Sequence, residues 1–181
     1  TLWRPLPVAQ PEYLAVFGQL HDNGHPGGLS PHEYQYLDQL DGVTSLGLER
    51  PGSTVNVAGA GTPAQVPVIY IDRNMLPTLG LQPVLGRNFS AQEDRPNGPK
   101  AVMIGYGLWQ RRFGGDADVI GRNIQVEGVP TTIVAVLPTS FNAVIGNADI
   151  GVPAALPAFS RDYNHNGYMA IARLADDANI E

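Results

Sequence analysis

The chain has 181 residues and a formal net charge of −6, and 43% of its residues are hydrophobic, which suffices for the core of one domain or two small ones. The absence of cysteine excludes disulfide bonds, thiolate metal sites and a thiol nucleophile. Its densest basic spot is Arg111-Arg112, which argues against nucleic-acid binding, because a phosphate backbone requires clustered Lys and Arg.

The first part of the chain predicts a strand, a helix and a second strand. Residues 13–17 (YLAVF) are typical of a strand. Ser30 and Glu33 form a capping-box pattern around Pro31, which suits the first helical position because its missing N–H costs nothing there. Residues 43–48 then indicate a returning strand. If the two strands are parallel, this is a right-handed crossover unit.

A hairpin and a short helix are expected next. Residues 54–58 and 66–72 alternate apolar and polar side chains on either side of the Gly-rich segment 59–63, which predicts two antiparallel strands joined by a longer turn. Residues 74–79 are expected to form a short helix.

From Gly86 onward the pattern changes to short strands joined by glycine turns. Residues 101–104 are typical of a strand, and residues 106–113 predict a helix that ends at Gly114-Gly115. Residues 124–127 and 131–136 predict a hairpin.

The last elements return the chain to its beginning. Residues 161–166 are a polar linker, and residues 169–174 predict one more strand that rejoins the first part. The expected fold class is therefore α+β, with one mostly-β lobe inserted in a lobe that contains the crossover unit.

Catalytic motifs are missing from the sequence. The G-x-x-x-x-G-K-[ST] loop of ATPases is absent, and Gly59-Ala60-Gly61 lacks the lysine. The G-x-S-x-G element of serine hydrolases is also absent. We therefore expect no enzymatic activity, and we assign no catalytic and no cofactor-binding residue.

Two segments contain residues of the kind that bind metal ions. His21, Asp22 and His25 offer up to three ligands to a zinc-like ion, but the following Pro26 and the glycines after it favour a solvated loop. Residues 162–167 (DYNHNG) copy the first half of a calcium loop. The copy fails later, because its twelfth position is an arginine instead of a glutamate. We therefore predict no tight metal site and no metal cofactor.

Structural roles are the preferred interpretation of the remaining conspicuous residues. Trp109 and Phe113 share a helix face at a spacing of four and are expected to fill the core. Arg87 and Arg122 follow glycines at turns, and we expect them to bond backbone carbonyls or to pair with the acidic residues 93–94.

A set of short motifs stands in a fixed order along the chain. The set comprises Leu85-Gly86-Arg87 with Phe89, Glu93-Asp94, residues 109–116 (WQRRFGGD), residues 120–122 (IGR), and Val136-Leu137-Pro138 followed by Phe141. Together these motifs resemble the MacB-like periplasmic core domain of FtsX-type ABC transporter permeases. Matching pieces outside this stretch are residues 2–7 (LWRPLP), 12–14, 30–37, 149–153 and 172–174. The resemblance thus covers nearly the whole chain, and its entry segment and WQRRF run are most similar to the duplicated permeases without a fused ATPase.

The resemblance implies both an architecture and a role. Residues 1–86 and 159–181 would form a porter-like lobe, and residues 87–158 the inserted mostly-β lobe. The function implied is that of a non-catalytic periplasmic domain, on a bacterial inner-membrane permease, that transmits conformational change driven by a separate cytosolic ATPase and contributes to substrate or partner contacts. The implied partners are that ATPase, reached through membrane helices, a second permease copy or half, and a periplasmic protein.

The chain is expected to be a segment excised from a longer protein, because it has neither an initiator Met nor a signal-peptide pattern. Members of the family continue past the Arg-Leu strand at residues 173–174 with a helix and another strand. The porter-like lobe would then be truncated, and strand 169–174 would be an exposed edge that favours self-association.

Two other classes of function stay open on the sequence alone. One is a secreted or periplasmic module that binds a small ligand or the cell wall in a cleft between the lobes. The other is a metal-dependent hydrolase built on His21, Asp22 and His25.

Overall fold

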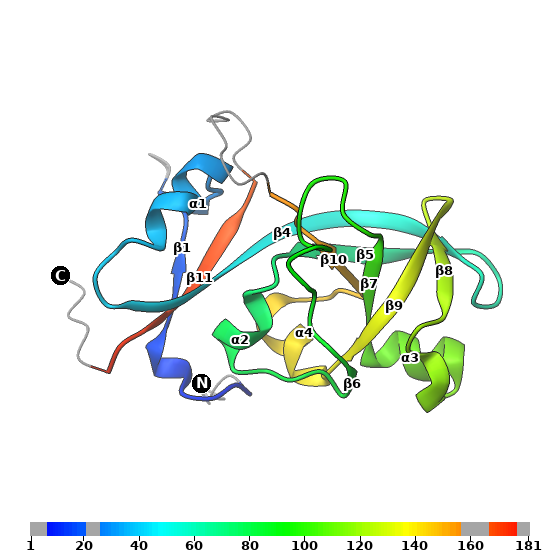
Figure 1. Cartoon of the computed structure of the whole chain (residues 1–181). Coiled ribbons are helices and arrows are strands. Elements are labelled where there is room, and N and C mark those ends of the chain that lie inside the picture. Colours follow the sequence, from blue (N-terminus) through cyan, green and yellow to red (C-terminus); the bar gives the residue numbers. More distant parts are fainter. Residues whose placement is uncertain (1–6, 21–25, 157–166, 177–181) are drawn as a thin grey trace.

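The computed structural model describes residues 7–20, 26–156 and 167–176 (Figure 1). It has a mixed sheet of nine strands with four short α-helices among the described residues. This confirms the α+β fold class. No helix in these ranges is long and apolar enough to cross a membrane.

The expected crossover unit is present. Strand β1 (Leu14–Phe17) follows a 3-10 turn, η1 (Pro11–Tyr13), and helix α1 (Pro31–Leu37) leads to strand β4 (Val43–Ala58). Both strands pair antiparallel with β11 (Met169–Leu174), which lies between them, so β1 and β4 run parallel. The capping box at the start of α1 also forms. A small separate pair joins β2 (Gln19–Leu20) to β3 (Pro26–Gly27).

The position of β11 corrects one expectation from the sequence. We expected strand 169–174 to be an exposed edge, but β11 is hydrogen-bonded on both sides, to β1 and to β4. The edge at this end of the sheet is β1, whose Val16 is 63% exposed. Strand β11 inserts antiparallel between β1 and β4. This pairing joins segments far apart in sequence, so no local pattern encodes it.

Strand β4 corrects a second expectation. Residues 43–48 and 54–58 were predicted as two strands, but they belong to one strand of 16 residues with an irregular register between Pro51 and Thr54. Pro51 has no N–H for the ladder. Gly52 is required beside it, because a Cβ there would lie 2.5 Å from Cγ1 of Val68. The Pro-Gly pair therefore bends the strand without ending it.

The rest of the chain matches most of the predicted elements. It comprises β5 (Ala64–Ile71), α2 (Met75–Leu79), β6 (Leu85–Gly86), β7 (Ala101–Gly105), α3 (Tyr106–Phe113), η2 (Ala117–Val119), β8 (Asn123–Val126), β9 (Val129–Leu137), α4 (Thr139–Ile145) and β10 (Ile150–Pro153). Helix α3 has the predicted bounds and ends at Gly114, whose φ of 60° is left-handed. The β4–β5 and β8–β9 hairpins are also confirmed.

Six of these strands close into a ring. The hydrogen-bonded order is β4, β5, β10, β7, β9, β8 and back to β4. The closing contact pairs Val57 and Ala58 of β4 with Val126 and Gln125 of β8. Figure 1 shows the β4–β5 hairpin arching over to reach β8. The second part of the molecule is thus a small β-barrel, in which side chains fill the interior.

The interior of the barrel is one of three hydrophobic clusters. It contains Val57, Val66, Val68, Val102, Ile104, Ile124, Ile133, Val136 and Ile150 from the six strands, with Leu108, Trp109 and Val119 from the segment after β7. A second cluster lies between the sheet and the helices α2 and α4, and a third lies under α1.

The division into a lobe of residues 1–86 and 159–181 and a lobe of residues 87–158 stays a prediction. One sheet runs through both, and β4 and β5 contribute to the crossover sheet and to the barrel alike.

Candidate functional site

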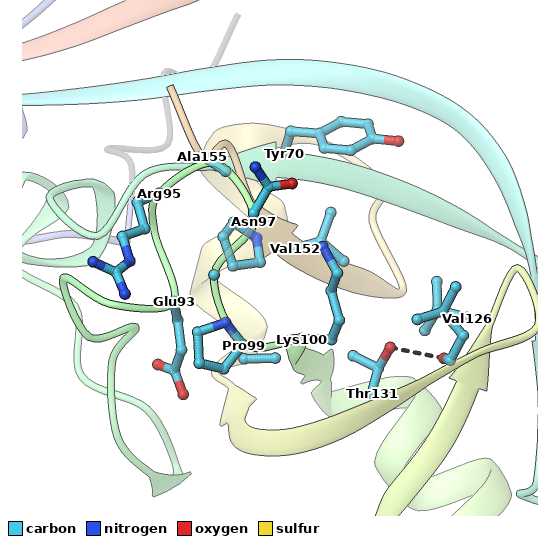
Figure 2. A pocket seen from close by; sticks show the side chains of 14 residues that line it. Tyr70, Glu93, Arg95, Asn97, Pro99, Lys100, Val126, Thr131, Val152 and Ala155 are labelled. Atoms are coloured by element: carbon cyan, nitrogen blue, oxygen red, sulfur yellow. Dashed lines mark hydrogen bonds between the residues drawn. The ribbon is translucent and has the colours of Figure 1, made fainter. Parts of the chain in front are cut away.

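A cavity of about 260 Å³ lies at one end of the barrel. Its floor is made of Tyr70 from β5, Val126 from β8 and Val152 from β10, whose side chains pack on the barrel core. Thr131 of β9 and Lys100, immediately before β7, complete the wall (Figure 2). Because β7 enters α3 at its other end, the helix and the cavity lie at opposite ends of this strand. The cavity is therefore the open mouth of the barrel.

The loop of residues 94–100 forms the rim of this mouth and is held from two sides. The Asp94 carboxylate accepts hydrogen bonds from the backbone N–H of Arg73, at 2.8 Å, and of Ala155, at 3.0 Å. Asn97 adopts a left-handed φ of 60°, and the N–H of Gly98 closes the turn onto the carbonyl of Arg95 at 3.0 Å. The rim is thus fixed by the Asp94 carboxylate and by the backbone turn at Gly98.

Glu93, which also lines the mouth, is already engaged. Its two carboxylate oxygens accept from the Arg87 guanidinium at 2.8 Å each, and Oε2 accepts from the Ser90 N–H as well. These bonds, the Arg87 pair first, hold the pKa of Glu93 near 2, below its usual 4.5. The predicted pairing of Arg87 with the acidic residues 93–94 is confirmed, and its role is structural.

Lys100 lines the mouth together with a second cation, Arg95. Its backbone is fixed to β9, because its carbonyl accepts from the N–H of Thr132 at 3.0 Å. Figure 2 shows its side chain extending along the mouth toward Val152, whereas the Arg95 guanidinium points away. The ion pairs found in the described ranges join Arg87 to Glu93, Arg111 to Asp149 and Arg122 to Asp116, so none of them uses Lys100.

A second polar cluster ties α1 to the sheet. The Asp72 carboxylate accepts from the Tyr34 hydroxyl at 2.6 Å and from the Leu48 N–H at 3.0 Å. Burial raises the pKa of Asp72 to about 6, although both hydrogen bonds act in the opposite direction. Burial, together with the adjacent Asp72 charge, also raises the pKa of Tyr34. The cluster does not line the barrel mouth, and we assign it to the packing of the crossover unit.

Structural contacts also engage three other conspicuous residues, Trp109, Arg112 and Arg122. Trp109 is buried, and its Nε1–H donates to the carbonyl of Asp116 at 2.9 Å. Arg112 donates to the carbonyls of Ala60 and Thr62 and so holds the β4–β5 turn. Arg122 donates to a backbone carbonyl as expected, but its acidic partner is Asp116 instead of residues 93–94.

The two candidate metal segments, with His21, Asp22, His25 and residues 162–166, lie outside the described residues. Among the residues described, no group of three or more His, Asp or Glu side chains is arranged to hold a metal ion.

No sequence motif marks the barrel mouth or Lys100. The one available signal was composition: Lys100 is the only lysine in the chain. The barrel itself depends on the pairing of β8 with β4, two strands about 70 positions apart in sequence, which local patterns do not encode.

A comparison with models of known families identifies the family of this chain. Residues 7–181 match the model of the MacB-like periplasmic core domain. The chain belongs to this family. As a MacB-like periplasmic core domain it is of the kind found in ABC transporter permeases, which confirms the resemblance seen in the sequence.

Solved structures support the same fold for this MacB-like domain. The periplasmic region of MacB from Actinobacillus actinomycetemcomitans aligns with a TM-score of 0.67 and 14% identity, covering 92% of this chain and 76% of that one. The extracellular domain of YknZ, a noncanonic ABC-type transporter from Gram-positive bacteria, aligns with a TM-score of 0.63 and 16% identity, covering 90% and 83%.

A third similar structure is a domain described as part of a permease of Porphyromonas gingivalis, with a TM-score of 0.64 and 18% identity over 84% of this chain. The MacB-like domain spans 65% of that structure's length. The search of curated proteins finds no significant match.

Proposed function

We propose that this domain is the extracytoplasmic part of an ABC transporter permease and that it transmits, without catalysis of its own, the motion driven by a separate cytosolic ATPase. Membership of the MacB-like family supports the transporter context. Its partners would be that ATPase, reached through the membrane helices of the permease, a second permease copy or half, and a periplasmic protein.

The observation that carries the mechanical role is the continuity of β4. This strand runs for 16 residues, pairs with β11 in the crossover sheet and closes the barrel through β8. A displacement applied at the crossover unit therefore reaches the barrel through hydrogen-bonded backbone, as in the rigid-body motions that couple sites in other switching proteins. Hinging at residues 72–85 would add relative motion between the two proposed lobes; the second expected hinge, residues 159–166, lies outside the described residues.

Distance measurements on the full-length permease with its ATPase test this role. The chain contains no cysteine, so spin labels can be placed at Tyr36→Cys, on the 57% exposed Tyr36 of α1, and at Ala117→Cys, an exposed residue beside the barrel. We expect the distance between Ala117 labels on two permease copies or halves to change when ATP binds. The distance between the two labels within one domain reports any hinge between the lobes.

A permease that hydrolyses ATP while both distances stay the same would overturn the proposal. An ATPase variant that binds but does not hydrolyse ATP serves as the control, because it should trap the ATP-bound distance.

A further inference from the structure

We propose that the open mouth of the barrel binds a small amphipathic anion, an organic acid with an apolar tail, and that Lys100 is its counter-ion. The ligand would place its tail against Tyr70, Val126 and Val152 and its carboxylate at the Lys100 ammonium (Figure 2). This binding does not depend on the proposed mechanical role. If the domain binds no such anion, the proposed mechanical role still stands.

The shape of the mouth suits a compact tail. Its volume of about 260 Å³ exceeds the roughly 150 Å³ of an apolar cavity that accommodates benzene and falls just below the roughly 300 Å³ at which drug-sized pockets begin. The walls are mainly apolar, with Val129 left 44% exposed at the rim and Pro99 and Pro153 beside it. Mouths of β-barrels are recurrent places for ligands of this kind.

The charges at the barrel mouth favour an anion as the ligand. The chain carries a net charge of −6, yet the side chain that extends along this mouth is its only lysine. The one carboxylate that lines the mouth, Glu93, is held in a bidentate pair by Arg87 at 2.8 Å. Arg95 also lines the mouth, and Arg50 stacks on Tyr70, with its guanidinium carbon 3.9 Å from the ring centroid. The mouth is thus a positive and partly apolar hollow in an acidic protein.

Lys100 is anchored at the mouth through its backbone. Its backbone is bonded to β9, and the loop before it is held by the two bonds to Asp94. An ammonium at the end of the lysine stem, beside an apolar floor, binds a carboxylate by a charge-assisted hydrogen bond, and it repels a cation with the same tail.

Three eight-carbon compounds with different head groups test the proposal on this 181-residue chain. Calorimetric titration should give the affinity order octanoate, then 1-octanol, then octylammonium, with octanoate at least about tenfold tighter than octanol, a difference of about 1.4 kcal/mol. In Lys100→Met, which keeps the apolar stem, octanoate should lose this advantage while octanol binding is retained.

Because Lys100 is the only lysine, a label on it shows independently where octanoate binds. Reductive ¹³C-methylation labels only Lys100 and the terminal amine, so addition of octanoate should shift the lysine signal and leave the terminal one in place. Arg95→Met is the matched control, because it removes the same charge from the other cation that lines the mouth, whose guanidinium points away from Lys100 and Val152.

The proposal is wrong if the three compounds bind equally or not at all, or if octanoate binds Lys100→Met as tightly as the wild type. It is also wrong if Arg95→Met weakens octanoate as much as Lys100→Met does, because the effect would then reflect net charge alone.

Discussion

Replacing Trp109 by alanine should destabilise the domain by about 3–5 kcal/mol, the range for large-to-small aromatic changes in cores. The indole is 8% exposed and lies in the barrel cluster next to Leu108 and Val119. It also packs edge-on against Tyr106, with ring centroids 5.4 Å apart. Alanine would leave a cavity at the closed end of the barrel and would leave the carbonyl of Asp116 without the indole donor.

Chemical denaturation followed by circular dichroism measures this loss. Tyr36→Ala is the matched control, because Tyr36 is a 57% exposed aromatic on α1 and should cost within about 0.5 kcal/mol. Trp109→Phe should lie in between, since it keeps most of the buried area and removes the hydrogen bond to Asp116. A loss below about 1 kcal/mol for Trp109→Ala would show that the indole is not a core anchor.

Replacing Glu49 by glutamine should stabilise the domain at alkaline pH by up to about 3 kcal/mol. Glu49 sits on β4 between Met169 of β11 and Ile71 of β5, and it is only 7% exposed. Its buried Oε2 has no hydrogen-bond partner within the described part of the chain. Burial therefore raises the pKa of this carboxyl from 4.5 to about 7, because the charged form loses its hydration.

The sign of the pH dependence follows from this raised pKa. Below pH 4.5 the carboxyl is protonated in both states, and between pH 4.5 and about 7 the folded state holds a proton that the unfolded state has lost. Stability conferred by the neutral form is therefore lost as the pH rises through about 7. Asp72, with its pKa raised to about 6, adds a smaller loss in the same direction. Glu93 acts oppositely, because its lowered pKa makes its stabilisation disappear only in acid.

Unfolding free energies of wild type and Glu49→Gln at pH 4.5 and pH 8 test this account. The two proteins should be nearly equal at the lower pH and differ most at the higher one. Glu12→Gln, which removes an exposed carboxylate, should follow the wild type throughout. Equal stabilities of wild type and Glu49→Gln at pH 8 would mean that the Glu49 carboxylate has a partner that compensates its burial.

Local signals predicted the elements that depend on neighbouring residues. The capping box of Ser30 and Glu33 set the start of α1, and Gly114 set the end of α3 because it supplies a left-handed backbone. The β8–β9 hairpin followed from Gly128 at its turn. Each of these features is decided within a few residues, where hydrogen bonds and sterics act directly.

Features that depend on distant pairing were missed. The insertion of β10 between β5 and β7, parallel to β5, and the closure of β8 onto β4 join segments far apart in sequence. The burial of Glu49 and the placement of Lys100 at the barrel mouth follow from these pairings and have no local pattern. The family resemblance indicated the domain type, but it did not indicate this site.

The central claim, that this is an extracytoplasmic domain of a membrane transporter, is tested most directly by labelling one exposed site in intact cells. Ala117→Cys lies on the exposed turn η2, and the full-length protein cleared of other cysteines provides the background. We expect a membrane-impermeant maleimide to label Ala117→Cys in cells whose inner membrane is intact, while a cysteine on the cytosolic ATPase stays unlabelled. Labelling of Ala117→Cys only after the inner membrane is lysed would contradict the account.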